Sequence, residues 1–432
     1  MPEMRVLLEH IHAPNQCDIE TYEKNGGYQA IKKAIPKIPP EKIIETVLQS
    51  ELRGRGGAGF PTGKKWSFIP KDPALDKYLV CNCDESEPGT FKDRLMIEHD
   101  PHQLIEGIIL SSYAIGCHRS FIYCRGEFFE GKRKLRKAIE EAKKKGYLGN
   151  NILGSDYSLE IVVHLGAGAY IAGEETALLN SLEGYRATPR LKPPFPAIAG
   201  LYRKPTVINN VETLCNVVHI VNRGAEWFQK IGKPKNTGTK IFQVSGQIKN
   251  PGCFEFPLGV SLREVLDAAG WMLPGRKFKA CYPGGSSCSL LVEKDLDISM
   301  DFESLAARKS MLGTASIIVM DDTADMVKVA TRLMVFYQNE SCGKCTPCRE
   351  GTRWVVQMLS RIERGGGTFH DLKKIEQVCK QMETDSFCPL AVGAAPPVLS
   401  AMAEFKDEFE AYIRRNPNAD GLPTMLVSYP YQ

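Results

Sequence analysis

Short apolar runs alternate with amphipathic stretches through the first half of the chain. Residues 78–81, 121–124 and 159–164 are apolar runs with polar or turn-forming neighbours, which predicts strands. The stretches near 99–115 and 130–145 carry apolar residues at helical spacing, which predicts helices between those strands. Strands that alternate with helices are typical of a parallel sheet covered by helices. We therefore expect an α/β domain.

A helix is also predicted ahead of these elements, over residues 40–53, because its apolar positions recur at helical spacing. We expect this helix to stop at Gly54, where a glycine-rich segment begins. Its predicted apolar face consists of Ile43, Ile44, Val47, Leu48 and Leu52.

The pattern changes past a polar linker in the middle of the chain. Strands are predicted at 240–245 and 316–320, and a helix at 261–269. Ser261 is placed to cap that helix, with Glu264 three residues further on, which is the spacing of a capping box. These elements predict a compact α+β unit.

From residue 323 onward the pattern is helical almost throughout, which predicts a helical bundle. The chain is therefore expected to fold as three domains. The predicted boundaries are 1–237 for the α/β domain, 238–322 for the small α+β domain and 323–432 for the helical bundle.

Composition and charge exclude some function classes. Of 432 residues, 43% are apolar and 25% are charged, as in ordinary globular proteins. A net charge of +4 is too small and too scattered for nucleic-acid binding. The most apolar window, residues 105–117, is too short and too polar to span a bilayer, so we expect no direct membrane insertion. We see no secretion signal, and 14 cysteines then indicate a reducing compartment.

Three closely spaced cysteines, Cys342, Cys345 and Cys348, indicate a metal or cluster site. Cysteines separated by two residues can converge on one [4Fe-4S] cluster, which then needs a fourth ligand from elsewhere. Cys388 is the better candidate because a proline follows it, and Cys379 is the rival. The alternative is a structural zinc site, although zinc sites usually use two separate pairs of cysteines.

The first glycine-rich segment, residues 52–66, contains the spacing Gly-x-Gly-x-x-Gly that is found in phosphate-binding loops. A helix and not a strand precedes it, which contradicts an ordinary dinucleotide-binding site. Its backbone can still approach a ligand closely, and Arg55, Lys64 and Lys65 are available for phosphate charge. The alternative is a flexible surface loop.

The second glycine-rich segment, residues 166–179, follows a predicted strand and opens a helix. Its Glu174 and Glu175 either stabilise the start of that helix or accept hydrogen bonds from ligand hydroxyls such as those of a ribose. A polar, acidic turn at residues 81–90 also follows a strand, where ligand sites of α/β proteins usually lie. The alternative for this turn is an ordinary loop.

In this order, the motifs resemble the NADH-binding flavoprotein component of respiratory complex I over nearly the whole chain. The segments that carry the resemblance are 54–66, 82–90, 166–175 and 340–348. The resemblance implies an α/β domain that binds flavin mononucleotide (FMN) and NADH, a small ubiquitin-like domain of the β-grasp type that binds soluble ligands in related proteins, and a C-terminal four-helix bundle with a [4Fe-4S] cluster. It implies hydride transfer from NADH to FMN and one-electron transfer to the cluster.

Carried over residue by residue, the resemblance also implies binding roles. The FMN-binding residues would be Gly54, Arg55, Gly56, Lys65, Asn82, Asp84, Tyr170, Gly173, Glu174, Asn209, Asn210 and Thr213. The NADH-binding residues would be Phe60, Phe68, Lys192 and Phe195, with Glu87 and Glu175 at the reacting centre, facing the nicotinamide and the ribose. The cluster ligands would be Cys342, Cys345, Cys348 and Cys388.

The resemblance implies two partners, a thioredoxin-like [2Fe-2S] subunit and a large iron-sulfur subunit of the same complex. It places the chain on the cytoplasmic side of the inner membrane, as a peripheral part of a membrane-bound NADH:quinone oxidoreductase. Two alternatives stand beside this interpretation. One is the diaphorase subunit of an NAD-dependent hydrogenase or formate dehydrogenase, and the other is a non-redox protein with a four-cysteine zinc scaffold and a glycine-rich nucleotide loop.

Overall fold

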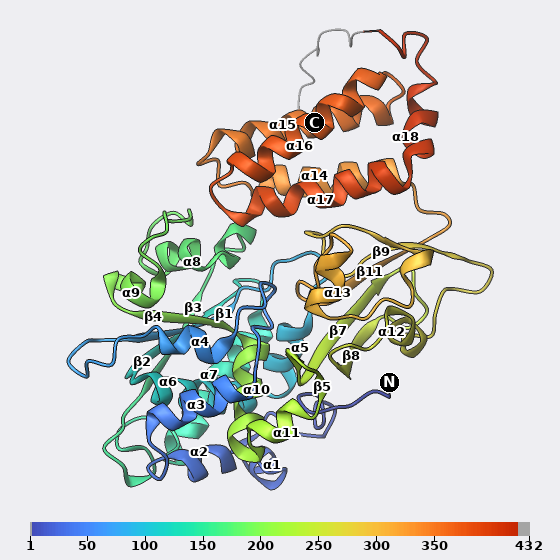
Figure 1. The fold of residues 1–432 in the computed structure, drawn as a ribbon. Coiled ribbons are helices and arrows are strands. Elements are labelled where there is room, and N and C mark those ends of the chain that lie inside the picture. Colours follow the sequence, from blue (N-terminus) through green and yellow to red (C-terminus); the bar gives the residue numbers. More distant parts are fainter. Residues whose placement is uncertain (1, 422–432) are drawn as a thin grey trace.

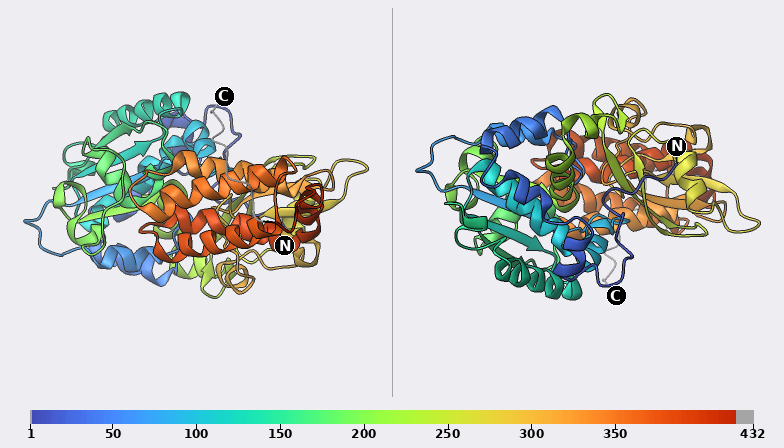
Figure 2. Two further views of the ribbon diagram at one scale, coloured as in Figure 1. Left: turned by 90° about the horizontal axis from the view of Figure 1, so that it is seen from above. Right: turned by 90° about the horizontal axis from the view of Figure 1, so that it is seen from below.

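The computed structural model describes residues 2–421 and shows three parts (Figure 1). An α/β part contains a four-stranded sheet, a smaller part contains a five-stranded sheet, and the C-terminal part is a bundle of helices. Seen from above, the bundle helices run side by side across the junction of the two sheet-containing parts (Figure 2). The predicted fold class is confirmed.

All four strands of the first sheet are parallel, in the order β3-β2-β1-β4. The three strands predicted from apolar runs are present, each with slightly different bounds, and β4 was not predicted. The strands are β1 (Tyr78–Cys83), β2 (Arg119–Cys124), β3 (Glu160–Leu165) and β4 (Thr206–Asn210).

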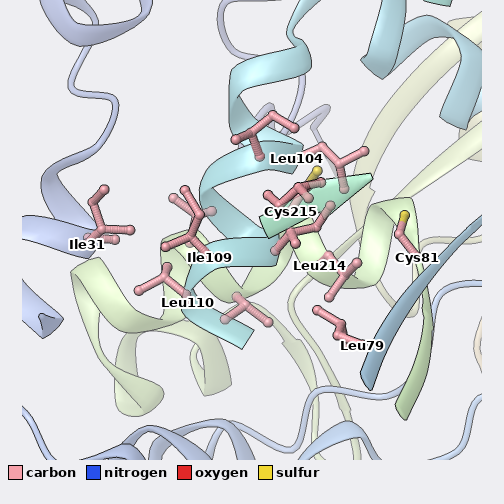
Figure 3. Close-up of a cluster of buried hydrophobic side chains, with 14 of the residues drawn as sticks. Ile31, Leu79, Cys81, Leu104, Ile109, Leu110, Leu214 and Cys215 are labelled. Carbon is pink, nitrogen blue, oxygen red and sulfur yellow. The ribbon is translucent and has the colours of Figure 1, made fainter. Parts of the chain in front are cut away.

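Helices α6 (Pro101–Ile115) and α10 (Val211–Arg223) cover one face of this sheet. Figure 3 shows their apolar side chains packed against β1, including Leu104 of α6, Leu214 of α10 and Leu79 of β1, all fully buried. Burial of such surface is the main stabilising contribution to a fold of this kind. The same layer includes α7 (Phe129–Lys144), which was predicted, and α5 (Lys92–His99), which is separated from α6 at Asp100.

The helix predicted over residues 40–53 is shorter than expected. Helix α3 spans Pro40–Gln49, so the prediction that it continues to Gly54 is wrong. Glu51 has a left-handed backbone conformation, with φ of 57°, which ends the helical path. Leu52 is nevertheless fully buried, because the chain folds back onto the core there.

The second sheet is mixed, in the order β10-β9-β11-β7-β8. The strands that come first and last along the sequence, β7 and β11, lie next to each other and are parallel, and the other neighbouring pairs are antiparallel. Helix α12 (Leu262–Ala268) begins with the predicted capping box of Ser261 and Glu264. This arrangement is the ubiquitin-like fold that the resemblance implied. The strands are β7 (Thr239–Gly246), β8 (Gly252–Pro257), β9 (Phe278–Tyr282), β10 (Leu291–Val292) and β11 (Ser316–Asp321).

Four long helices form the C-terminal bundle, with a short fifth helix, α18 (Lys406–Ile413), packed at one end. The bundle core is apolar and fully buried, as Met334, Val355 and Val398 illustrate. Within the described residues, no helix is long and apolar enough to cross a membrane. The four long helices are α14 (Met326–Glu340), α15 (Thr346–Glu363), α16 (Phe369–Asp385) and α17 (Pro389–Glu404).

Short elements complete the described chain. They are α1 (Ile19–Lys24), α2 (Gln29–Ala34), α4 (Thr62–Ser67), α8 (Glu175–Leu182), α9 (Pro196–Ala199), α11 (Ala225–Gln229), α13 (Phe302–Ala307), β5 (Gly232–Lys233), β6 (Asn236–Thr237) and the 3₁₀ helices Ile152–Gly154, Tyr170–Gly173, Leu201–Arg203 and Glu293–Asp295.

A buried ion-pair network joins the two sheet-containing parts. Glu212, at the start of α10, lies 3.0 Å from the Nζ of Lys92 on α5 and also pairs with Lys240 on β7. The backbone N–H of Ile241 donates to the same carboxylate at 3.0 Å. All three charged side chains are fully buried. Burial alone would raise the pKa of Glu212, but Lys240, Lys92 and Arg55 lower it, so the carboxylate stays ionised.

We expect Glu212→Gln to lower the free energy of unfolding by about 3–5 kcal/mol, because two buried lysines would lose their shared counter-charge. Urea denaturation followed by tryptophan fluorescence measures this. The matched control is Glu140→Gln, which breaks the exposed pair with Lys143 and is expected to cost less than about 1 kcal/mol. Equal losses in the two variants would contradict the role given to Glu212.

Candidate functional site

The carboxyl ends of the parallel strands bring the polar segments together at one edge of the first sheet. Strand β1 ends at the acidic turn that contains Asp84, and its neighbour β4 ends at Asn209 and Asn210. Strand β3 leads into the second glycine-rich segment, beginning at Gly166. Ligand sites of open α/β sheets lie at this edge.

The first glycine-rich segment forms a tight loop between α3 and α4. The N–H of Gly54 donates to the carbonyl of Phe60 at 2.9 Å, which closes the loop. Gly57 has a φ of 129°, which L side chains rarely adopt. A Cβ atom on Gly56 would lie only 2.8 Å from the Cβ of Asn210. The loop therefore reaches the end of β4 because Gly56 has no side chain.

Arg55 points into the protein and away from the open side of this loop. Its guanidinium is buried and donates to the carbonyl of Thr237 at 2.7 Å, while its backbone N–H donates to the hydroxyl of Thr213 at 2.8 Å. Burial lowers the pKa of Arg55 to about 10. This geometry contradicts the expectation that the Arg55 guanidinium supplies phosphate charge. Arg55 and Thr213 hold the loop in place.

Asn82 and Asp84 lie beside the second glycine-rich segment. The side-chain amide of Asn82 donates to the carbonyl of Gly173 at 2.9 Å. Asp84 is 1% exposed, and its Oδ1 has no hydrogen-bond partner among the described residues. Burial raises the pKa of Asp84 to about 7. A buried carboxylate oxygen without a donor is what a ligand hydroxyl would satisfy.

Two lysines and two glutamates form a charged network at the start of α8. Lys65 lies 3.3 Å from Glu175, and Lys192 lies 3.0 Å from Glu175 and 3.1 Å from Glu174. The other carboxylate oxygen of Glu174 accepts the N–H groups of Thr176 and Ala177, so Glu174 caps α8. Burial alone would raise the pKa of Glu175, but Lys65 and Lys192 lower it, and the net shift is downward.

The asparagine pair at the end of β4 is bonded to neighbouring protein groups. The Oδ1 of Asn209 accepts the indole N–H of Trp66 at 2.9 Å. The side chain of Asn210 accepts a hydrogen bond from Lys92 at 3.1 Å and donates to Asp93 at 2.6 Å. It also caps α10. The Asn210 side chain therefore packs against the glycine loop at Gly56 and is hydrogen-bonded to Lys92 of the ion-pair network.

Glu87 is held by groups from distant parts of the sequence. One carboxylate oxygen accepts the hydroxyl of Tyr170 at 2.7 Å. The other accepts the hydroxyl of Ser286 at 3.0 Å and the N–H of Ser287 at 2.9 Å. The pKa of Glu87 is raised by burial, against the lowering effect of these donors. Sequence reasoning missed the two serines, because nothing local marks a contact across about two hundred residues.

Three predicted aromatic contacts are exposed. Phe60, Phe68 and Phe195 are 47%, 49% and 58% exposed, although large aromatic side chains are usually buried. The rings of Phe60 and Phe68 have centroids 6.3 Å apart. Phe195 lies on the same turn as Lys192. Flat apolar surfaces at the rim of a polar site are suited to stacking against a base.

Cys388 lies with the three-cysteine run, and Cys379 does not. Burial and the neighbouring Cys348, Cys342 and Cys345 together raise the pKa of Cys388 to about 12. Cys379 is fully buried in the bundle core, where Glu383 is its acidic neighbour. Within residues 2–421 the thiols do not converge on a single ion-sized point, and a cluster of four iron atoms does not require that they do. The donor set of four clustered thiols fits an iron-sulfur cluster.

The cysteine loop is attached to the α/β part at three points. Glu340 accepts the backbone N–H of Tyr170 at 2.8 Å. Lys344 donates to the carbonyl of Pro189 at 2.7 Å, and Arg186 donates to the carbonyl of Cys342 at 3.2 Å. The cluster site therefore lies directly against the segments that line the edge of the first sheet.

Family models match three stretches of this chain. The Nuo51 FMN-binding domain matches residues 47–219, an SLBB domain matches 241–290, and the NADH-ubiquinone oxidoreductase-F iron-sulfur binding region matches 328–412. The chain is 54% identical to the NADH-quinone oxidoreductase F-subunit 2 of Rhizobium meliloti (strain 1021), over 95% of this chain and 99% of that relative. This chain belongs to the family of NADH-quinone oxidoreductase F-subunits.

Other comparisons agree with membership of this family. The NADH-quinone oxidoreductase F-subunit of Escherichia coli (strain K12) is 48% identical, over 92% of this chain and 90% of that relative. The crystal structure of an NAD⁺-reducing [NiFe]-hydrogenase in the H₂-reduced state matches with a TM-score of 0.83 and 35% identity, over 95% of this chain and 67% of that chain.

The cofactors of the F-subunits follow from the matched models. FMN and a [4Fe-4S] cluster are confirmed as the expected cofactors, and the zinc-scaffold alternative is wrong, because an iron-sulfur binding region covers the cysteines. The site fits FMN: the buried Asp84 Oδ1 lacks a donor within the described residues, and the backbone comes close to this carboxylate at Gly173, where a Cβ atom would lie 4.0 Å from the other Asp84 oxygen. The chain is part of a multisubunit assembly, as its curated relatives and the hydrogenase indicate.

We expect Cys388→Ser to lose most of the cluster iron, because a cube held by three thiolates lacks one ligand. Cys379→Ser is the matched control and is expected to keep its iron. Iron content and paramagnetic-resonance signals of anaerobically purified protein measure this. Loss of the cluster in the Cys379 variant alone would overturn the choice of Cys388.

Proposed function

We propose that this chain is the NADH-oxidising component of a respiratory NADH:quinone oxidoreductase. Bound FMN would accept a hydride from NADH and pass single electrons to the [4Fe-4S] cluster and onward to partner iron-sulfur subunits. The protein needs no acid or base for direct hydride transfer, so its residues align the two nucleotides. The observation that carries this proposal is the attachment of the cysteine loop to Tyr170, beside the edge of the first sheet.

The FMN assignments divide into backbone and side-chain roles. Gly56 would offer its backbone N–H group to the ligand, Gly54 would shape the loop through its own bond to Phe60, and Lys65 would offer charge. Asp84 would accept a ligand hydroxyl at its free oxygen. The remaining proposed FMN-site residues are Asn82, Tyr170, Gly173, Glu174, Asn209 and Asn210, with Arg55 and Thr213 acting through the loop that they hold.

NADH would lie across the exposed aromatic rim and the charged network. Phe60, Phe68 and Phe195 would stack against the adenine end, with Lys192 beside them. Glu175 would face the ribose. The two lysines that contact Glu175 keep its carboxylate ionised, and an ionised carboxylate accepts hydrogen bonds from hydroxyl groups such as those of a ribose. The last member of the set, Glu87, would face the nicotinamide.

The three cysteines of the run, together with Cys388, would hold the cluster. The chain would divide into domains at 237/238 and 322/323, which lie between the elements of its three parts.

The proposed partners are a thioredoxin-like [2Fe-2S] subunit and a large iron-sulfur subunit. The proposed location is the cytoplasmic side of the inner membrane, as a peripheral part of the complex. The second candidate is a hydrogenase diaphorase, which the similarity to the NAD⁺-reducing [NiFe]-hydrogenase favours.

We expect anaerobically purified protein to carry flavin and iron, and NADH to bleach the flavin absorbance, because hydride transfer reduces the flavin. Optical spectra before and after NADH, together with iron analysis, measure this. Protein that binds FMN and keeps its colour with NADH would contradict the proposal.

We expect NADH to be preferred over NADPH, because an ionised carboxylate at the ribose repels the extra phosphate. Glu175→Gln should raise kcat/KM for NADPH relative to NADH by about tenfold, which corresponds to about 1.4 kcal/mol. The control is Glu160→Gln, which breaks an exposed pair with Arg119 at the opposite end of the sheet. Steady-state kinetics with both nucleotides would refute the assignment if the ratio were unchanged.

A further inference from the structure

Two buried hydroxyl groups lie directly behind Glu87. The hydroxyl oxygens of Ser286 and Tyr337 are 2.8 Å apart, and both side chains are fully buried. Ser286 also contacts Glu87, at 3.0 Å. The three residues come from three separate parts of the fold: the turn after β1, the loop after β9, and α14 of the bundle.

The direction of these hydrogen bonds follows from counting protons. An ionised carboxylate only accepts, so Ser286 donates its single hydroxyl proton to Glu87. The Ser286 oxygen is then free to accept, and Tyr337 must be the donor between them. Both oxygens of Glu87 are therefore held, one by Tyr170 and the other by Ser286 and the N–H of Ser287.

A tyrosine at the same interface shows what an ordinary buried hydroxyl does there. Tyr282, on β9, donates to the backbone carbonyl of Pro397 in the bundle at 3.4 Å. A backbone carbonyl therefore satisfies a buried tyrosine hydroxyl at this interface without a serine. The contact from Tyr337 to Ser286 instead continues to a carboxylate.

We propose that Ser286 and Tyr337 are positioning residues that fix the Glu87 carboxylate for the nicotinamide. Because Tyr337 belongs to α14, the packing of the helical bundle against the other two parts then sets the geometry of the hydride-transfer site. The proposal rests on the proposed function, because Glu87 is assigned to the nicotinamide only there. Neither residue touches a reacting atom. Both act through Glu87.

The titratable groups that face Glu87 come from three elements: Tyr170 from the 3₁₀ helix Tyr170–Gly173, Tyr337 from α14 and Cys288 from the loop after β9. Burial raises the pKa of each of these three groups, so they stay neutral at ordinary pH. Removing a donor to the carboxylate should therefore raise the pKa of Glu87, with no charge on these three groups to mask the change.

The test uses the FMN-loaded full chain as wild type and as Ser286→Ala, Tyr337→Phe, Tyr282→Phe and Glu87→Gln. Infrared pH titration of the carboxyl stretch, identified by its absence in Glu87→Gln, reports Glu87 directly and needs no turnover. We expect the midpoint to move up by about one pH unit in Ser286→Ala and by a smaller amount in Tyr337→Phe, because a hydrogen bond to the charged form is lost. Tyr282→Phe should match the wild type.

Kinetics provide the second readout. We expect kcat/KM for NADH with an artificial electron acceptor to fall about tenfold in Ser286→Ala and less in Tyr337→Phe, with FMN content unchanged. Tyr337→Phe removes one oxygen and keeps the ring, so it remains informative if Ser286→Ala folds poorly.

Unchanged infrared midpoints in both variants would overturn the inference, and so would an equal shift in Tyr282→Phe. A shift in Ser286→Ala alone would remove Tyr337 from the proposed pair and overturn the link to the bundle. The failure of the proposed function looks different. In that case NADH does not bleach the flavin of the wild-type protein, whatever the midpoints are.

Discussion

The site depends on one buried carboxylate, that of Glu212. It pairs with both Lys92 and Lys240 in the interior, where an unpaired charge would be strongly destabilising, and Asp93 supplies Lys92 with a second carboxylate. Lys92 also bonds to Asn210, which supports the glycine loop at Gly56. A single ion-pair network therefore fixes α5, the start of α10, β7 and the end of β4 relative to one another. The position of the loop is a consequence of this network.

The bundle is attached through a different kind of contact. Each of the three hydrogen bonds between the cysteine loop and the α/β part has a backbone atom on one side, at Tyr170, Pro189 or Cys342. Backbone contacts constrain position more closely than contacts between flexible side chains, because the backbone is already ordered by its own hydrogen bonds. These contacts hold the cluster loop against the segments at the sheet edge.

Local patterns were sufficient for much of the fold. Three of the four parallel strands, the capping box at Ser261 and the C-terminal helices were predicted from periodicity and turn residues. The predicted end of α3 was wrong, because Glu51 has a left-handed backbone conformation that ends the helix although the helical pattern of apolar residues continues past it. Strand β4 was missed, because it is only five residues long, runs directly into α10 and has no periodic signal of its own. The inward direction of Arg55 was also missed, because a buried arginine has the same sequence signature as an exposed one.

The sequence by itself determined the chemistry of this protein: glycines where a backbone must approach a ligand, cysteines at cluster spacing, and acidic turns after strands. These are local properties, since each depends on residues a few positions apart. Only the tertiary structure decided which groups meet. It brought Cys388 and not Cys379 to the three-cysteine run, and it placed Ser286 against Glu87. Such contacts join residues far apart in the chain, and they arise only when separately formed elements pack and bury their polar groups together.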